Sequence, residues 1–348
     1  MLILNFTILV TEDCNLNCKY CYEGSNKEKR HMNTQIADKV VEFILNEIRK
    51  SPEDKHPLQI VFHGGEPLLN FDIIKYLDKS ISESVKDRQI TYDMTTNGTI
   101  LNDEIKNFIK EKINSFSISI DGTKESHDKN RIFSNGLGSY DLVIKNVKKL
   151  LDEGVQIRAR MTFNEYNVSN LFESVVSVYK LGFKYIVPAI DFYANWNDDS
   201  LEILSNEIDK LIEFKKENIQ AEISLTNIKM LNLKKGHCFG GICSFTIDAK
   251  GLVYPCTYAI GNKDYVIGDI NKEEYYLDEY RINELKKINS IDNKDCLKCT
   301  RYDYCSGVRC KILNKLATGN YHIPPYITCF EEHLNVRVTK KLLDYCYA

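Results

Sequence analysis

The stretch Leu2–Cys21, LILNFTILVTEDCNLNCKYC, joins an expected β-strand to a loop that holds three cysteines. Its first half, Leu2–Val10, is apolar with an alternating character, which is typical of a strand. The loop that follows contains Cys14, Cys18 and Cys21. Three thiolates at this spacing can bind one face of a four-iron cluster and leave the fourth iron open. The stretch therefore predicts an iron–sulfur site at the carboxyl end of the first strand.

An open iron can be chelated by the amine and carboxylate of an amino acid, and S-adenosylmethionine (SAM) is one such molecule. Its sulfonium would then lie beside the cluster, where one electron can break a sulfur–carbon bond and release a 5′-deoxyadenosyl radical. The alternatives are a zinc loop or thiols without a ligand. A structural zinc site normally has four ligands, and His31 is the only further Cys or His near this loop.

Residues 1–190 repeat one pattern of a short β-rich run, a turn and an amphipathic helix. This alternation predicts an α/β fold with a parallel sheet and right-handed crossovers, and six such units can form a partial (β/α)6 TIM-like barrel. Three asparagines stand where helices are expected to begin, as N-cap residues: Asn33, Asn102 and Asn167. The expected strands are Leu2–Val10, Leu58–Phe62, Gln89–Thr95, Ser115–Ile120, Gln156–Thr162 and Lys184–Ala189.

The charges of the chain are balanced, with 46 Lys and Arg against 49 Asp and Glu and a net charge of −3. The two signs are interleaved, so the composition favours neither nucleic acid nor a membrane surface as a partner. No apolar run reaches membrane-spanning length, and the first residues lack the basic segment of a signal peptide. The 12 cysteines are therefore expected in a reducing, cytoplasmic compartment, as metal ligands or catalytic thiols.

The cysteine loop, with Tyr20 at its aromatic position, resembles the signature of the radical SAM superfamily. Further motifs similar to those of that family occur in order, each after an expected strand. They are His63–Pro67 (HGGEP), Thr96–Gly98 (TNG), Ser117–Gly122 (SISIDG) and Arg160–Thr162 (RMT). Each alone is a weak signal, since any tight turn between a strand and a helix favours glycine. Together they extend the resemblance over the first 190 residues.

The resemblance implies three groups of site residues. Cys14, Cys18 and Cys21 would be the catalytic cluster ligands. The contacts with SAM would come from Tyr20, Gly64, Gly65, Glu66, Thr96, Asn97, Ser119, Asp121 and Arg160, with Ser119 at the ribose and Arg160 at the carboxylate. His127 and Arg131 lie in a stretch that resembles the lining of the substrate cavity, although Arg131 would serve equally well in a surface ion pair.

The other nine cysteines lie beyond Gly236. The run Cys296–Cys310 is compact enough to bind metal, and by itself it fits a zinc ribbon as well as an iron–sulfur cluster. In its wider context it resembles the SPASM domain of peptide-modifying radical SAM enzymes, which holds two auxiliary four-iron clusters. The resemblance assigns Cys238, Cys243, Cys256 and Cys310 to one cluster, and Cys296, Cys299, Cys305 and Cys329 to the other. Cys346 is left over, as a helix residue.

These patterns predict a radical SAM partial barrel over residues 1–195 and a bridging helical region over 196–235. A small cysteine-rich iron–sulfur SPASM domain is expected over 236–330, and a C-terminal helix over 331–348. The expected cofactors are SAM and three 4Fe-4S clusters, one radical SAM and two auxiliary. A flavodoxin or ferredoxin-type reductant is an expected partner. Because the first strand starts at residue 2, a peptide substrate would need a separate leader-peptide recognition protein or would bind the barrel directly.

Sulfatase-maturating enzymes share this architecture, and the resemblance implies an acidic base directly after the cysteine that matches Cys256. Thr257 takes that position here, and a hydroxyl is a poor general base near neutral pH. The sequence therefore favours a maturase of a ribosomally synthesised, cysteine-containing peptide, with a thioether crosslink as the expected product. The alternatives are a sulfatase-maturase-type or other dehydrogenase acting on serine, cysteine or an alcohol, and, from another class, a multi-cluster electron carrier.

Overall fold

The computed structural model describes residues 3–21, 29–51, 53–272 and 276–347. They form two compact units that are interleaved along the chain. Unit 1 comprises Met1–Ile118, Arg131–Gln156 and Phe239–Leu285. Unit 2 comprises Ser119–Asn130, Ile157–Cys238 and Lys286–Ala348. The domain boundaries expected from the sequence remain a prediction.

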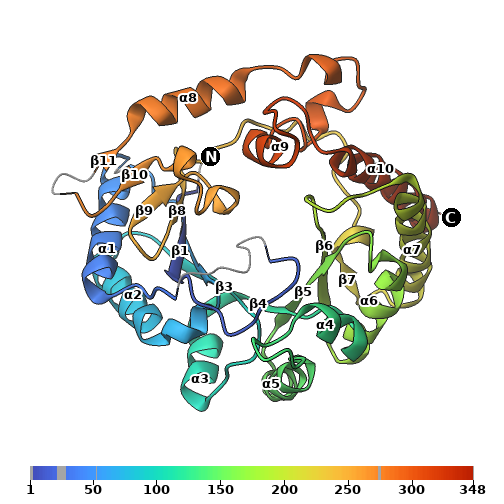
Figure 1. The fold of residues 1–348 in the computed structure, drawn as a ribbon, viewed down its shortest axis with the longest axis horizontal. Helices are drawn as coiled ribbons and strands as arrows, with labels where there is room; N and C mark the ends of the chain where they lie inside the picture. Colours follow the sequence, from blue (N-terminus) through green and yellow to red (C-terminus); the bar gives the residue numbers. More distant parts are fainter. Residues whose placement is uncertain (1–2, 22–28, 52, 273–275, 348) are drawn as a thin grey trace. The chain divides into compact units, whose positions relative to one another are not determined.

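The sheet of unit 1 contains parallel strands that follow one another in chain order (Figure 1). They are β1 (Asn5–Thr11), β2 (Leu58–Gly64), β3 (Ile90–Thr96) and β4 (Ile113–Ser119). β1 is buried at every position after its first residue, which is typical of a strand covered on both faces. The predicted α/β fold with a parallel sheet is confirmed. Leu2, the expected start of the first strand, lies outside the described residues, and β1 begins at Asn5.

Helices connect these strands, and their apolar stripes complete the core of unit 1. They are α1 (Thr34–Arg49), η1 (Pro67–Asn70), α2 (Phe71–Ser84), α3 (Asp103–Lys112) and α5 (Tyr140–Asp152). Two predicted N-caps are confirmed, because the Asn33 side chain accepts a hydrogen bond from the N–H of Ile36 and Asn102 accepts one from Ile105. These caps fix where α1 and α3 begin.

Residues from the cysteine-rich half of the sequence extend the sheet of unit 1. β8 (Ser244–Ile247) pairs in parallel with β1, and β9 (Leu252–Tyr254), β10 (Gly268–Asp269) and β11 (Tyr276–Leu277) continue it in antiparallel order. Two short helical turns, η4 (Thr257–Ala259) and η5 (Lys263–Tyr265), lie between β9 and β10, and α8 (Glu279–Ser290) follows β11. Phe245 of β8 stacks on Phe6 of β1 with ring centroids 5.6 Å apart, and Phe43 of α1 packs edge-on against both. This aromatic cluster joins segments that are far apart in the sequence.

Unit 2 contains three further parallel strands, β5 (Ile157–Phe163), β6 (Tyr185–Ile190) and β7 (Glu222–Ile223), among its described residues. Its helices in this part are α4 (Lys124–Asn130), η2 (Val168–Asn170), α6 (Leu171–Lys180), α7 (Asp198–Glu217) and η3 (Ser224–Thr226). The predicted cap at Asn167 is wrong, because its side chain makes no capping bond and instead accepts the N–H of Asn164. The side-chain oxygen of Asn167 closes the turn that begins at Asn164, so it is not available to cap the helix.

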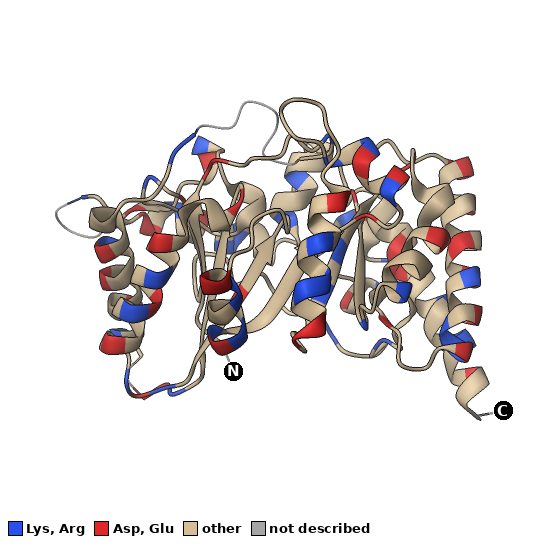
Figure 2. Cartoon of the chain, turned by 90° about the horizontal axis from the view of Figure 1, so that it is seen from below, with Lys and Arg blue, Asp and Glu red and all other residues tan. Residues whose placement is uncertain are grey.

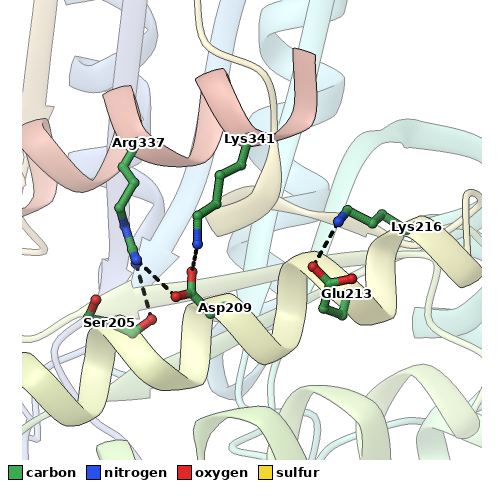
Figure 3. Close-up of polar contacts among 6 residues, drawn as sticks. All are labelled: Ser205, Asp209, Glu213, Lys216, Arg337 and Lys341. Atoms are coloured by element: carbon green, nitrogen blue, oxygen red, sulfur yellow. Dashed lines mark hydrogen bonds and ion pairs between the residues drawn. The ribbon is translucent and has the colours of Figure 1, made fainter. Parts of the chain in front are cut away.

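The end of the chain in unit 2 is helical, with η6 (Lys294–Cys296), η7 (Tyr302–Tyr304), α9 (Lys311–Thr318) and α10 (Tyr326–Tyr347). α10 begins earlier than the expected helix at residue 331. Figure 3 shows how it packs on α7, where Arg337 and Lys341 each bind Asp209 at 2.9 Å. Such half-exposed pairs stabilise by only about 0.2–1 kcal/mol each, so the buried Val338 and Leu342 contribute more to this packing.

Within the described ranges, no helix is both long and apolar enough to cross a membrane. Basic and acidic positions are interspersed along the helices of the ribbon (Figure 2).

Candidate functional site

The three-cysteine loop follows the carboxyl end of β1, where a parallel sheet places its active residues. The side chain of Asp13 accepts the N–H of Cys14 at 2.9 Å, and the sulfur of Cys14 accepts the N–H of Leu16 at 3.5 Å. Cys18 and Cys21 are joined by a backbone bond from N–H to carbonyl at 3.2 Å. All three thiols are partly accessible. The loop is thus folded by its own short-range bonds with its sulfurs within reach of a ligand.

The glycine pair Gly64–Gly65, at the end of β2, contacts this loop through the backbone. The N–H of Gly65 binds the carbonyl of Thr11 at 3.0 Å, and the N–H of Glu66 binds that of Asp13 at 2.8 Å. A Cβ atom on Gly64 or Gly65 would lie 2.3 Å from these same carbonyl oxygens. Only glycine fits such a close approach of two backbones. The two glycines, predicted as cofactor contacts, therefore have a structural reason of their own to be glycine.

Glu66 joins the second and third motifs. Its carboxylate is fully buried, and one oxygen accepts the hydroxyl of Thr96 at 2.7 Å and the N–H of Leu68 at 3.1 Å. The other oxygen accepts the N–H of Asn97 at 2.7 Å. Hydrogen bonds to an ionised, buried acceptor are among the strongest that a protein makes. Glu66 therefore fixes the turn after β3 relative to the turn after β2.

The side chain of Asn97 extends this hydrogen-bond network to the cysteine loop. Its side-chain amide donates to Asn15 at 2.8 Å and lies 3.8 Å from the sulfur of Cys14. Thr99 completes the network, because its hydroxyl accepts the side chain of Asn15 at 2.8 Å. The sequence analysis missed Asn15 and Thr99. The run of polar residues after β3, Thr96 to Thr99, was the signal that could have identified Thr99.

Arg131 belongs to the same unit and lies against the cysteine loop. Its guanidinium lies 5.2 Å from the ring centroid of Tyr20, a cation–π contact at a position that is only 7% exposed. The backbone beside it is bonded to the loop as well, since Asn17 donates to the carbonyl of Ile132 at 2.7 Å. Arg131 thus supports the aromatic residue of the loop, and its role as a substrate contact remains a prediction.

The remaining predicted SAM contacts lie in unit 2. The buried carboxylate of Asp121 accepts a hydrogen bond from the N–H of Thr162 at 3.1 Å. The backbone N–H of Asp121 donates to the ring Nδ1 of His127 at 3.4 Å. His127 is fully buried, whereas Ser119 is half-buried and Arg160 is exposed. Asp121 also lines a small pocket, together with Ser126, Met161, Thr162, Asn167 and Ser174. Within this unit, Ser119 and Arg160 have the accessibility that a ligand contact requires, and His127 does not.

Four cysteines of unit 2 lie close enough for their thiols to affect one another's pKa: Cys296, Cys299, Cys305 and Cys329. Burial, together with the neighbouring thiols of Cys305, Cys296 and Cys299, raises the pKa of Cys329 to about 11. Burial also raises the pKa of Cys305, with contributions from Glu332 and Cys296. Thiols that disfavour each other's ionisation are stabilised as thiolates by a bound cation or cluster. These four residues are the set that the sequence analysis assigned to one auxiliary cluster.

The surroundings of the C-terminal cysteines fit a ligand rich in acceptors. Among the buried side-chain atoms without a hydrogen-bond partner in the described part of the chain are the donors Asn293 Nδ2, Arg309 Nε and Thr328 Oγ1. They stand close in sequence to Cys296, Cys310 and Cys329 respectively. Buried donors without a partner are rare and need an explanation, and the sulfides and thiolates of a four-iron cluster accept hydrogen bonds. The residues present therefore fit such a group.

The described residues contain no cluster of three Cys, His, Asp or Glu side chains that could hold a single metal ion. Around a single ion such as zinc, every ligand must reach one atom. The thiolates around a four-iron cluster stand farther apart, since each binds a different iron.

The ligands proposed for the second auxiliary cluster are divided between the units. Cys238 and Cys310 belong to unit 2, where the Cys238 thiol adds to the effect of burial in raising the pKa of Cys310. Cys243 and Cys256 belong to unit 1, in which Cys243 is buried beside β8. The grouping of these four residues remains a prediction.

The chain matches known proteins in sequence. The model of the radical SAM superfamily matches residues 8–171. The chain is 28% identical over 329 residues to the cysteine-type anaerobic sulfatase-maturating enzyme of Clostridium novyi (strain NT), with 86% of each chain covered. It is 27% identical over 329 residues to the radical SAM cyclopropyl synthase TigE of Paramaledivibacter caminithermalis, with 86% of this chain and 66% of that protein covered.

Two solved structures are similar in fold. Native anSMEcpe with bound AdoMet superposes with a TM-score of 0.77 at 20% identity, over 99% of both chains. Streptococcus suis SuiB bound to its precursor peptide SuiA superposes with a TM-score of 0.68 at 16% identity, over 94% of this chain and 76% of that one. At these identities the likeness establishes the fold.

Proposed function

Because the chain belongs to the radical SAM superfamily, we propose that it modifies a ribosomally made peptide that contains cysteine, and that it joins the thiol to a carbon as a thioether. The peptide would lose two hydrogens for each carbon–sulfur bond formed. Relatives that act on peptides or sulfatases support the general class, since the chain covers 86% of a sulfatase-maturating enzyme and is similar in fold to SuiB.

We infer that Cys14, Cys18 and Cys21 hold one four-iron cluster and that the C-terminal cysteines hold two more. When bound, these groups and SAM would supply a 5′-deoxyadenosyl radical for hydrogen abstraction and an acceptor for one electron. Ser119 and Arg160 would bind the cofactor, since both are accessible on unit 2. A flavodoxin or ferredoxin is the class of protein that would supply the first electron.

The residues of unit 1 would hold the cysteine loop in a fixed orientation. Glu66 fixes Thr96 and Asn97 by bonds of 2.7 Å, and Asn97 brings an amide N–H to 3.8 Å from the sulfur of Cys14. A donor near a cluster thiolate stabilises the more negative, reduced state. Arg131 holds the ring of Tyr20 in place. Together these contacts would keep the loop in one conformation while the cofactor binds.

The observation that carries the thioether proposal is Thr257, which follows Cys256 at the start of η4. Formation of an aldehyde from a substrate thiol or hydroxyl requires a base at the reacting group, and threonine is a poor one. A thiolate that has already lost its proton needs no base at position 257.

Co-expression with a neighbouring cysteine-rich peptide tests this proposal. The expected product is lighter by two hydrogens, and the affected cysteine resists alkylation after full reduction, whereas a disulfide would be reduced and alkylated. Replacement of that peptide cysteine by alanine should abolish the mass change. A crosslink between two carbons with every thiol still reactive would contradict the thioether.

A sulfatase-maturase activity is the second candidate, favoured by the relative from Clostridium novyi, which the chain matches over 86% of its length. Its product would be formylglycine, which hydrazide labelling detects. Reaction of the enzyme with a sulfatase-derived peptide to give a hydrazide-reactive product would favour this candidate over the thioether maturase.

Iron content tests the cluster assignment separately. Three four-iron clusters predict on the order of twelve irons in the anaerobically reconstituted protein, and replacing Cys14, Cys18 and Cys21 together by alanine should remove about a third. The same triple variant should produce no 5′-deoxyadenosine, which also separates an enzyme from an electron carrier. Cys346→Ala is the matched control, since this exposed cysteine on α10 is assigned to no cluster and its loss should change neither measurement.

A further inference from the structure

Lys311 is a buried lysine whose contacts the proposed function does not explain. It begins α9, directly after Cys310, and is only 3% exposed. Its ammonium group donates to the carbonyl of Ile291 at 2.9 Å, to the ring Nδ1 of His322 at 3.2 Å and to the side-chain oxygen of Asn293. These three acceptors are neutral, so the bonds satisfy its protons without compensating its charge.

Asn293 connects this lysine to the cysteines. The residue is fully buried, and its carbonyl accepts the N–H of Cys296 at 2.9 Å. Its side-chain oxygen is bonded to Lys311, while its side-chain nitrogen has no hydrogen-bond partner among the described residues. Lys311, Asn293 and the backbone N–H of Cys296 are therefore connected by hydrogen bonds in that order.

The charges around Lys311 leave its cation short of a counter-ion. Asp292 lies next to Asn293 in the chain, but it is exposed and its carboxylate already accepts the hydroxyl of Tyr302 at 2.6 Å. A buried cation without an ionic partner is costly to maintain. The thiolate of Cys296 in a bound cluster would be a negative group that Lys311 approaches through Asn293.

We propose that Lys311, acting through Asn293, stabilises the reduced state of the four-iron cluster bound by Cys296, Cys299, Cys305 and Cys329. The inference rests on the cluster assignment made above. A four-iron cluster becomes more negative when it accepts an electron, so a nearby buried cation raises its reduction potential. The side-chain N–H of Asn293, which is buried and has no partner among the described residues, would transmit the effect by donating to the cluster at Cys296. Lys311 is therefore a positioning residue that makes this cluster the better electron acceptor.

Redox titration of the reconstituted protein, followed by electron paramagnetic resonance, tests the proposal. Lys311→Met should lower the midpoint potential of one auxiliary cluster, and Lys311→Arg should restore most of the difference because it retains the charge. Lys294→Met is the matched control. It removes the same charge two residues from Cys296, but Lys294 is exposed, so water screens it and the potential should not change.

Asn293→Ala keeps the lysine and removes the amide, and it should lower the potential in the same direction. This variant carries the test if Lys311→Met loses iron. Full iron content with an unchanged potential, in Lys311→Met or in Asn293→Ala, would overturn the role of Lys311 alone. Native protein that holds iron only at the N-terminal loop would instead refute the cluster assignment, and with it this inference.

Discussion

Glu66→Gln is the most informative single change, because it alters one atom of a fully buried side chain that joins three segments. One carboxylate oxygen accepts two donors, from Thr96 and Leu68, and the other accepts the N–H of Asn97. The oxygen of glutamine can replace only one of the two. If it takes the position with two donors, its NH2 group must face the N–H of Asn97, and two donors then meet.

The magnitude follows from these contacts. A hydrogen bond to a charged group contributes about 1.5–3 kcal/mol, and a buried donor left without an acceptor costs about 1–3 kcal/mol. We therefore expect local destabilisation of at least ~1.5–3 kcal/mol at the turn after β3. Each 1.4 kcal/mol is about tenfold in an opening equilibrium, so amide exchange at Asn97 should accelerate roughly 10- to 100-fold.

Hydrogen exchange measured by mass spectrometry on peptides that span β3 and its turn is the assay. Thr96→Val is the control, since it removes one bond to the charged oxygen, at about 1.5–3 kcal/mol, but leaves the acceptors of Leu68 and of the Asn97 N–H in place. Exchange at Asn97 should therefore accelerate less than in Glu66→Gln. Iron at the Cys14 loop should become more labile in Glu66→Gln than in this control. Unchanged exchange at Asn97 together with full retention of iron would refute the role of Glu66 as the connection between these turns.

Three further changes test other parts of the fold. Phe245→Ala should reduce the free energy of unfolding by about 3–5 kcal/mol, read from urea titration, because the ring is buried between β1 and α1, and an equal midpoint in the variant would contradict this packing. Gly122→Ala places a Cβ atom 2.2 Å from a side chain of α6 at φ +104°, so it should lower the urea midpoint more than Gly154→Ala, which has φ +76° but open space around it. Lys106 and Lys110 of α3 lower the pKa of Glu153 from 4.5 to about 2, so its stabilisation is complete above pH 4.5 and is lost as the pH falls towards 2. The urea midpoint of Glu153→Gln should therefore approach that of the native protein over this range.

The candidate site was predictable wherever its signal is local. Cys14, Cys18 and Cys21 are recognisable because three thiols fall within one loop after an apolar strand, and the caps at Asn33 and Asn102 follow from residue type and position. Asn167 has the same residue type and the same apparent position, yet its side chain bonds to Asn164. Local pattern cannot distinguish a helix cap from a turn that closes on itself, since both use the same side-chain oxygen.

The amino-acid sequence by itself determined the order of strands and helices, the parallel α/β class and the three-cysteine loop, because periodicity and spacing act over a few neighbouring residues. The tertiary structure alone decided that β8 pairs with β1, that the carboxylate of Glu66 is buried among the turns, and that Lys311 reaches Asn293. These contacts join residues tens to hundreds of positions apart. They depend on strand register and on which buried donors and acceptors meet after the chain has packed, and no local pattern encodes either.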